Sequence, residues 1–274
     1  MQIKHQISEL GGLSKQERKL VADLRRQGLS IVDNRAVIEK LKITRSAANQ
    51  ILLRLEKKGW LQRVERGRYI FVDLTATNPT PIVEDALVLA MDLFSPCYLT
   101  GWTAAEHWGL TEQIFNSILV YSATYQRISE NNIGGVNFVL RRVQDSDIFG
   151  TKVIWSSNHK IVIADMHRTI IDILNRPEDG GSAIQTFEIC REYFQSSEAD
   201  TNKLLLYADK IGNGTVFKRL GFIGEQLLPT AVEFIETCQK NISKGVSLFD
   251  PSGPKKGRIY SKWNLKINIA LGDT

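Results

Sequence analysis

Three charged residues in ADMHRTIIDIL, residues 164–174, have the types and spacing of a hydrolytic centre. Asp165, Arg168 and Asp172 are three and four residues apart, so a helix would place them on one face. Two carboxylates on one face can hold a metal ion for hydrolysis, but with an arginine between them they also form intrahelical ion pairs. No Glu-x-Lys strand and no glycine-rich phosphate loop accompanies them, so the pattern favours ion pairing.

Cysteines and histidines are too scattered to suggest a metal site. Cys97, Cys190 and Cys238 form no CxxC pair, and none of the four histidines lies at ligand spacing from them. We expect no metal, no cofactor and no enzymatic activity. An odd, dispersed set of thiols is typical of a reducing compartment. The chain also has no long apolar run and no leader pattern, so we expect a cytoplasmic protein with no membrane partner.

Another group of residues, in TRSAANQILLRLEKKG (44–59), suits base recognition instead. A helix between the N-cap Thr44 and the stop signal Gly59 would bury a face of alanine, isoleucine and leucine at positions 48, 51, 52 and 55. Its opposite face would carry amides and cations, interrupted by Leu53. Short amides and arginines are the side chains that pair with base edges in the major groove. These candidates for DNA contact are Arg45, Ser46, Asn49, Gln50, Arg54 and Lys57.

The neighbouring elements would position that helix as part of a winged helix-turn-helix. A helix from Ser14 to Gly28 and a shorter one capped by Asp33 precede it. WLQRVERGRYIFV (60–72) follows as two short strands around a turn at 65–67. This hairpin is the wing, and its tip carries the remaining candidates for DNA contact, Arg63, Arg66 and Arg68.

Charge supports the same assignment. Residues 1–73 hold 16 Lys and Arg against 8 Asp and Glu, a net +8, whereas the whole chain carries +5. The rest of the chain therefore carries −3. A basic N-terminal third on a nearly neutral body indicates that the first domain meets a polyanion. We expect double-stranded DNA.

The domain limits follow from composition. DLTATNPTPIVED (73–85) is rich in Pro, Thr and Asn, which is typical of an exposed connection. We expect a winged helix-turn-helix domain over 1–73, a linker over 74–81 and a larger domain over 82–274. In the larger domain a strand-rich middle precedes a run of helices, which predicts an α+β fold rather than a doubly wound sheet. We expect the tail of this domain to form a loop followed by one strand.

The remaining notable residues have structural interpretations. We expect His107 and His167 to be packed side chains, and the tryptophans at 102, 108, 155 and 263 to be core or interface anchors. The adjacent carboxylates Glu84–Asp85 and Glu178–Asp179 do not suggest a paired site. Two basic segments, VFKRLG (216–221) and PKKGR (254–258), could bind a polyanion, but a solvated surface is the simpler interpretation.

Five segments together resemble one family, the AbiEi antitoxins of type IV toxin–antitoxin systems, which regulate transcription in a viral defence system. They are LEKKGWLQRVERGRYI, YLTGWTAAEHWGLTEQ, ADMHRTIIDILNRPEDGG, LLLYADKIGNGTVFKRLGFIGE and LFDPSGPKKGRIYSKWNLKIN. They cover most of residues 14–268 in the expected order. Family members commonly carry Asp-Pro where this chain has Asp165–Met166. We therefore do not carry the family's local turn over to this position, while the resemblance itself stands.

The resemblance implies a function. The winged helix would bind the chain's own promoter, usually at inverted repeats, and repress its operon, while the larger domain would counteract a nucleotidyltransferase toxin without a stable complex. Matching segments imply candidates for the antitoxin function, namely Asp165, Arg168, Thr169, Asp172, Arg176, Pro177, Lys218 and Arg219. Ion pairing and packing are an equally good interpretation of these residues. Two other functions are open: a ligand-responsive winged-helix transcription factor, and a metal-dependent nuclease that uses Asp165 or Asp172.

Overall fold

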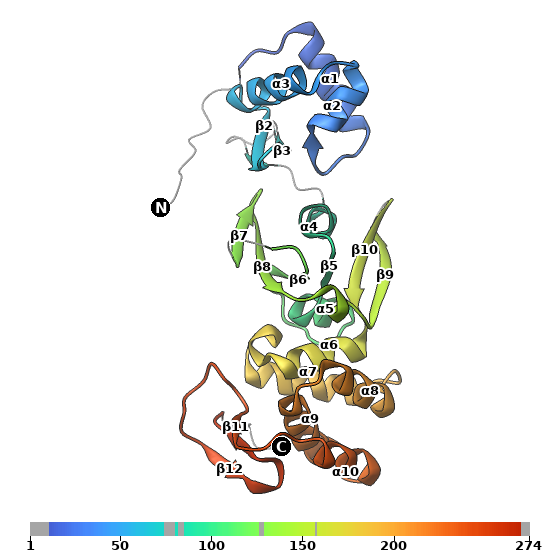
Figure 1. The fold of residues 1–274 in the computed structure, drawn as a ribbon, viewed down its shortest axis with the longest axis vertical. Helices are drawn as coiled ribbons and strands as arrows, with labels where there is room; N and C mark the ends of the chain where they lie inside the picture. The colour runs from blue at the N-terminus through green and yellow to red at the C-terminus, as the bar shows by residue number, and fades with distance from the viewer. Residues whose placement is uncertain (1–10, 74–79, 82–84, 126–128, 157, 270–274) are drawn as a thin grey trace. The chain divides into compact units, whose positions relative to one another are not determined.

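The computed structural model describes residues 11–73, 80–81, 85–125, 129–156 and 158–269 (Figure 1). It divides into two compact units, Met1–Leu93 with Glu130–Phe138, and Phe94–Ser129 with Val139–Thr274. The first unit therefore takes in residues that we assigned to the larger domain. Most of the predicted linker, residues 74–79, lies outside the described residues. The domain limits 1–73 and 82–274 stay a prediction.

The first unit has the predicted winged-helix order, and the α+β class of the chain is confirmed. Its elements are α1 (Lys15–Arg26), β1 (Val32–Asp33), α2 (Asn34–Leu41), α3 (Arg45–Lys57), β2 (Leu61–Glu65), β3 (Arg68–Asp73), β4 (Thr80–Pro81) and α4 (Ala86–Phe94), of which α4 ends at the boundary between the units. The sheet has the order β1-β3-β2, with β4 paired to β3. Leucines and valines of α1, α2 and α3 pack with Tyr69 and Phe71 of β3 in one core.

Side-chain caps begin all three helices of the winged helix, as the sequence predicts. Ser14 forms a capping box with Glu17. The carboxylate of Asp33 accepts from the Ala36 N–H at 3.0 Å, and the hydroxyl of Thr44 accepts from the Ala47 N–H at 3.3 Å. Such a cap is worth about 1 kcal/mol because it satisfies a helix N–H that has no partner within the helix.

Glu17 joins α1 to α3. Its side chain is 7% exposed and accepts from Lys58 Nζ at 2.7 Å and from Arg54 Nε at 3.2 Å. The Lys58 ammonium first, and the Ser14 main-chain N–H next, lower the pKa of Glu17 from 4.5 to about 2. One buried carboxylate thus bonds α1 to the C-terminal end of α3, in addition to the apolar core that they share.

This carboxylate predicts an acid sensitivity. Because its folded pKa lies below the unfolded value of 4.5, ionised Glu17 stabilises the fold above pH 4.5 and loses this effect as the pH falls towards 2. We expect Glu17→Gln to cost on the order of 1 kcal/mol at pH 7 and to flatten the stability profile over that acid range. Urea unfolding at several pH values measures both, with Glu39→Gln as an exposed control. Parallel profiles of Glu17→Gln and the unchanged chain would contradict the role of Glu17.

The second unit contains a mixed sheet in the order β8-β6-β5-β10-β9. Only the part of β8 from Val139 onward belongs to this unit. Strand β10 runs parallel to β5 and antiparallel to β9, and β5 is antiparallel to β6. The strands are β5 (Cys97–Leu99), β6 (Ser117–Ser122), β8 (Val136–Arg142), β9 (Thr151–Ser156) and β10 (His159–Ala164). Strand β7 (Glu130–Ile133), which was not predicted, forms a hairpin with β8 and belongs to the first unit.

Helices follow the sheet along the chain, as predicted. They are α5 (Gly101–His107), which lies between β5 and β6, and then α6 (Met166–Asn175), α7 (Ala183–Gln195), α8 (Thr201–Ile211), α9 (Gly214–Leu227) and α10 (Val232–Lys240). The predicted cap Asp200 begins α8. Apolar side chains of α6, α7, α8, α9 and α10 share one core with Trp263, so this helical layer is a single packed body. Short 3-10 turns lie at Asp145–Asp147, Pro177–Gly180 and Ser261–Trp263.

Two predictions for the C-terminal part were wrong. The tail forms a three-stranded sheet, β11 (Ser247–Leu248), β13 (Leu265–Ile267) and β12 (Arg258–Tyr260), in the order β11-β13-β12, rather than a loop and one strand. These strands have two or three residues each, too few for a periodic pattern to be visible. VFKRLG is not a solvated patch, because it lies within α9 and is buried.

The predicted roles of the histidines and tryptophans are confirmed only in part. His167 is buried, with Nδ1 2.7 Å from the hydroxyl of Tyr193, while His107 is exposed with its ring against that of Trp108. Trp102 and Trp263 are buried. Trp155 lies on β9 with 62% of its surface exposed, so it is not a core residue of this unit.

Candidate nucleic-acid interface

Helix α3 buries one face and exposes the other, as its periodicity predicts. Ala48, Leu52 and Leu55 are fully buried, and Ile51 is partly buried in the same core. Leu53 is 41% exposed. All six predicted contact residues of this helix are exposed, and they are Arg45, Ser46, Asn49, Gln50, Arg54 and Lys57. The helix therefore presents amides and cations to solvent along its outer face.

The wing reverses direction at Arg66–Gly67. Gly67 has a φ of 78°, in the left-handed region that glycine adopts without strain, so the turn requires this residue. A register shift between Arg63 and Glu65 bends the strand before the turn. Arg63 and Arg66 are exposed, and Arg68 is half-buried. Two of the three predicted wing arginines are thus exposed to solvent.

A groove of about 960 Å³ lies where the N-termini of α2 and α3 approach the wing. Four predicted residues line it, and the sequence interpretation missed two others, Asn34 and Arg35. The complete lining is Asp33, Asn34, Arg35, Ile38, Arg45, Asn49, Arg66, Gly67 and Arg68. Since the two elements that would read DNA converge on this groove, we call it the helix–wing groove.

Asn34 is more than a lining residue. Its Nδ2 donates to Oδ1 of Asn49 at 3.2 Å, which holds the amide of a predicted base-reading residue in place. Both Asn34 and Arg35 directly follow the Asp33 cap, so they occupy the first turn of α2. The first turn of a helix exposes unpaired N–H groups that favour anions. Their position directly after a helix cap was therefore a signal in the sequence by which both residues could have been predicted as contact residues.

Internal bonds hold three of the six predicted cations, whereas Arg45, Lys57 and Arg66 have no such bond among the described residues. Arg54 pairs with Glu17 at 3.2 Å and Arg68 with Glu65 at 3.3 Å, while Arg63 Nε donates to the main-chain oxygen of Glu65 at 3.2 Å. Within the described parts of the chain, Arg45 and Arg66 have no carboxylate at ion-pair distance. These two cations are therefore available to an external anion without breaking an internal bond.

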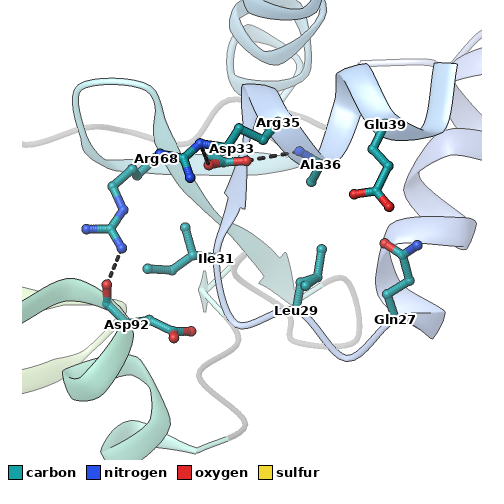
Figure 2. A pocket seen from close by; sticks show the side chains of 9 residues that line it. All are labelled: Gln27, Leu29, Ile31, Asp33, Arg35, Ala36, Glu39, Arg68 and Asp92. Atoms are coloured by element: carbon teal, nitrogen blue, oxygen red, sulfur yellow. Dashed lines mark hydrogen bonds and ion pairs between the residues drawn. The ribbon is translucent and has the colours of Figure 1, made fainter. Parts of the chain in front are cut away.

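Arg68 is engaged further on its other side. A second pocket, of about 500 Å³, is lined by Gln27, Leu29, Ile31, Asp33, Arg35, Ala36, Glu39, Arg68 and Asp92 (Figure 2). There the guanidinium of Arg68 donates to the main-chain oxygens of Asp92 and Leu93 at the end of α4. Arg68 is therefore partly a structural residue of the first unit.

The antitoxin candidates on α6 form a buried network rather than a surface. Arg168 and Asp172 are each 1% exposed, and Arg168 Nε lies 2.9 Å from Asp172 Oδ1. The second carboxylate oxygen accepts from Thr100 at 2.7 Å and from Tyr98 at 3.1 Å. Burial raises the pKa of Asp172, and the guanidinium of Arg168 and these two hydroxyls oppose the rise. Ion pairing is thus what the structure shows here.

Asp165 is the N-cap of α6 rather than a member of the same helix face. Its Oδ1 accepts from the Arg168 N–H at 2.8 Å, and its Oδ2 accepts from Tyr207 at 3.0 Å and Lys203 at 3.2 Å. Thr169 is buried beside it, with its hydroxyl bonded to the Asp165 main-chain oxygen. No described group of three His, Cys, Asp or Glu residues could hold a metal ion.

Lys218 and Arg219 attach the C-terminal sheet to α9. Lys218 is fully buried and donates to Gly245 O at 2.7 Å and Ser247 Oγ at 3.0 Å. Arg219 donates to the main-chain oxygens of Phe249, Leu248 and Leu174 at 3.0, 2.9 and 2.7 Å. Burial lowers the pKa of Arg219 to about 10, which leaves it charged at neutral pH. Pro177 is buried at the start of a 3-10 turn, and Arg176 alone among the candidates is exposed.

Comparisons with known proteins agree with this organisation. Residues 19–72 match the model of the family described as "Transcriptional regulator, AbiEi antitoxin", which confirms the predicted resemblance for the winged helix. The fold is similar to that of the RV2827C protein from Mycobacterium tuberculosis, with a TM-score of 0.62 and 13% identity over 95% of this chain and 94% of that chain. At this identity the likeness concerns the fold alone. No curated protein matches the sequence. No described helix is long and apolar enough to cross a bilayer.

Proposed function

We propose that this chain, whose residues 19–72 match the AbiEi antitoxin family of transcriptional regulators, binds the promoter of its own operon through the helix–wing groove and represses it. The observation that carries the proposal is the pair Arg45 and Arg66. Both line one groove, come from the two DNA-reading elements and lack an internal ion pair among the described residues. If these cations only interacted with solvent, there would be no reason for one from α3 and one from the wing to line the same groove.

In the proposed complex α3 enters the major groove. Its 13 residues span about 20 Å, so one exposed face can follow the bases of a half-site. Arg45, Asn49 and Gln50 would contact base edges, with Asn49 oriented by Asn34. Arg63 and Arg66 on the wing would contact phosphates, and two copies on inverted repeats would give a symmetric complex.

Binding to the promoter upstream of the chain's own gene tests this half of the proposal. We expect sequence-specific binding that weakens steeply as salt rises. Gln50→Ala should reduce the preference for the promoter over a shuffled duplex by roughly tenfold, since an amide that reads a base is lost. Fluorescence anisotropy with both duplexes measures the ratio, with Gln62→Ala on β2 as the control. Equal affinity of the unchanged chain for both duplexes would end the repressor hypothesis.

We further propose that the region 82–274 is the antitoxin domain of a type IV system and counteracts a nucleotidyltransferase toxin without a stable complex. The family match and the resemblance of the α6, α9 and tail segments support this role. Asp165, Arg168, Asp172, Lys218 and Arg219 are buried, so we assign them the task of holding the domain in shape. Arg176 is the candidate that a partner could reach.

Growth rescue tests the antitoxin half. The product of the adjacent gene, if it is a nucleotidyltransferase, is induced in a heterologous bacterium with and without this chain. Restored growth, with no co-purification of the two proteins, supports a type IV system. Growth arrest despite full expression of the chain would leave a regulator whose second unit has another task.

A further inference from the structure

Strand β9 ends the mixed sheet of the second unit, with no neighbour on its outer side among the described strands (Figure 1). It pairs with β10 over six residue pairs, from Thr151 with Ala164 to Ser156 with His159, without a shift in register. In an antiparallel pair every second residue turns its N–H and C=O groups away from the partner strand. The outer side of β9, which we call the β9 edge, is therefore a regular row of groups with which a further strand could pair.

The side chains along the β9 edge are apolar and exposed on one face. Val153 and Trp155 are two residues apart, so they lie on the same face of the sheet. Val153 is 53% exposed and Trp155 is 62% exposed. Between them Ile154 lies on the other face, opposite the fully buried Ile161, so that other face is turned to the core. The exposed face thus offers an aromatic and a β-branched side chain beside an unused backbone edge.

The usual protections of an edge strand are missing from β9. Natural edges are blunted by a proline, by a bulge or by charges that discourage pairing. Strand β9 has no proline, its register is regular, and its one charged residue, Lys152, holds its ammonium 5.1 Å from the centre of the Trp108 ring. Lys160 of β10 lies over Trp155 at 5.5 Å but leaves most of that residue exposed. An apolar edge without these protections tends to pair with another strand.

A second copy of the same strand fits this edge. A two-fold axis perpendicular to the sheet, passing between the two copies at Ile154, makes them antiparallel and keeps their exposed faces on the same side. Val153 then lies opposite Trp155 of the second copy and Trp155 opposite its Val153, and pairs of an aromatic with a β-branched side chain stabilise neighbouring strands. Lys152 lies opposite Ser156 of the second copy, so no like charges meet. The edge is therefore complementary to itself.

We infer that two copies of this chain associate through the β9 edge, so that the sheets of their second units join into one. A strand of a toxin would form a stable complex, which the proposed type IV function excludes, whereas a second copy is always present at the chain's own concentration. The dimer does not depend on the proposed function, but it would supply the second winged helix for an inverted repeat. A single strand pair is a small interface, so we expect a reversible dimer with a Kd on the order of 10 µM.

Analytical ultracentrifugation of the full chain without DNA, over a range of concentrations, tests this. Val153→Glu/Trp155→Glu places glutamates opposite glutamates of the second copy, and Val153→Lys/Trp155→Lys does the same with lysines. Each variant alone should raise the Kd by about tenfold or more, because like charges directly opposite on paired strands repel. The matched control is Leu206→Glu/Val232→Glu, at exposed apolar positions of α8 and α10, which should dimerise like the unchanged chain.

A mixture of the glutamate and lysine variants separates lost pairing from lost folding. Opposite charges then face one another, so heterodimers should form more tightly than the dimers of either variant alone, which a misfolded chain could not do. An unchanged chain that stays monomeric about tenfold above the expected Kd would overturn the inference. So would a glutamate variant that dimerises like the control, or a mixture that stays monomeric although circular dichroism shows both variants folded.

The outcomes separate this inference from the proposed function, because association is measured without DNA. If the chain prefers its promoter but does not dimerise, the inference fails and the repressor function stands. If it dimerises through the β9 edge but has no promoter preference, the repressor function fails and the interface stands. If both hold, the glutamate variant should lose affinity for a duplex with both repeats and keep its affinity for a single half-site.

Discussion

Arg45→Ala/Arg66→Ala is expected to weaken binding to the chain's own promoter by about 100-fold, which is close to 3 kcal/mol for one base contact and one phosphate contact. The loss should be large because neither guanidinium is held by a carboxylate among the described residues, and both line the helix–wing groove. Arg66→Ala alone should weaken all duplexes alike, whereas Arg45→Ala should also reduce discrimination between them. Fluorescence anisotropy at fixed salt measures each variant.

The matched control is Arg18→Ala/Arg26→Ala, which removes the same charge from the exposed side of α1. Only a small, salt-sensitive loss is expected there. The Arg45/Arg66 variant should still rescue growth in the toxin assay, because its second unit is unchanged. A promoter affinity within threefold of the unchanged chain would show that the groove is not the site of specific binding.

Asp172→Ala is expected to destabilise the chain by about 3 to 5 kcal/mol, enough to remove most of the stability of a domain of ordinary size. The reason is that Arg168, 1% exposed, would keep its charge without the carboxylate 2.9 Å away, and that Thr100 and Tyr98 would lose their acceptor. Chemical denaturation followed by circular dichroism gives the free energy of unfolding.

Two further variants test why Asp172→Ala is destabilising. Asp172→Asn keeps an acceptor for Thr100 and Tyr98 and should cost less than Asp172→Ala, because only the ion pair is lost. Asp23→Ala removes a carboxylate of the surface pairs with Arg26 and Lys40, and should cost at most about 1 kcal/mol. A cost below 1 kcal/mol for Asp172→Ala would show that the α6 network does not hold the second unit together.

Loss of growth rescue by an Asp172 variant therefore needs a stability measurement beside it. The α6 network joins α6 to β5 through Tyr98 and to the adjacent Thr100, so its failure would disturb the sheet as well as the helix. Arg176→Ala is the informative comparison, since this exposed side chain can be removed without exposing the core.

Local chemistry explains which parts of the fold could be predicted. The caps Ser14, Asp33 and Asp200 were visible because a short polar side chain before an apolar period specifies a helix start within a few residues. The wing was visible because Gly67 supplies the left-handed turn between two short strands. The sheet β11-β13-β12 was not visible, since its strands are held by α9 rather than by their own pattern.

The sequence by itself determined the winged helix, the polar outer face of α3 and the concentration of positive charge in residues 1–73, because these depend on residues close together in the chain. Only the tertiary structure decided which charges are free. It joined Arg54 to Glu17, buried Arg168, Lys218 and Arg219, and left Arg45 and Arg66 without carboxylates among the described residues. The physical reason is that burial and ion pairing depend on contacts between distant segments. No local pattern encodes which of two similar cations will lie beside a carboxylate.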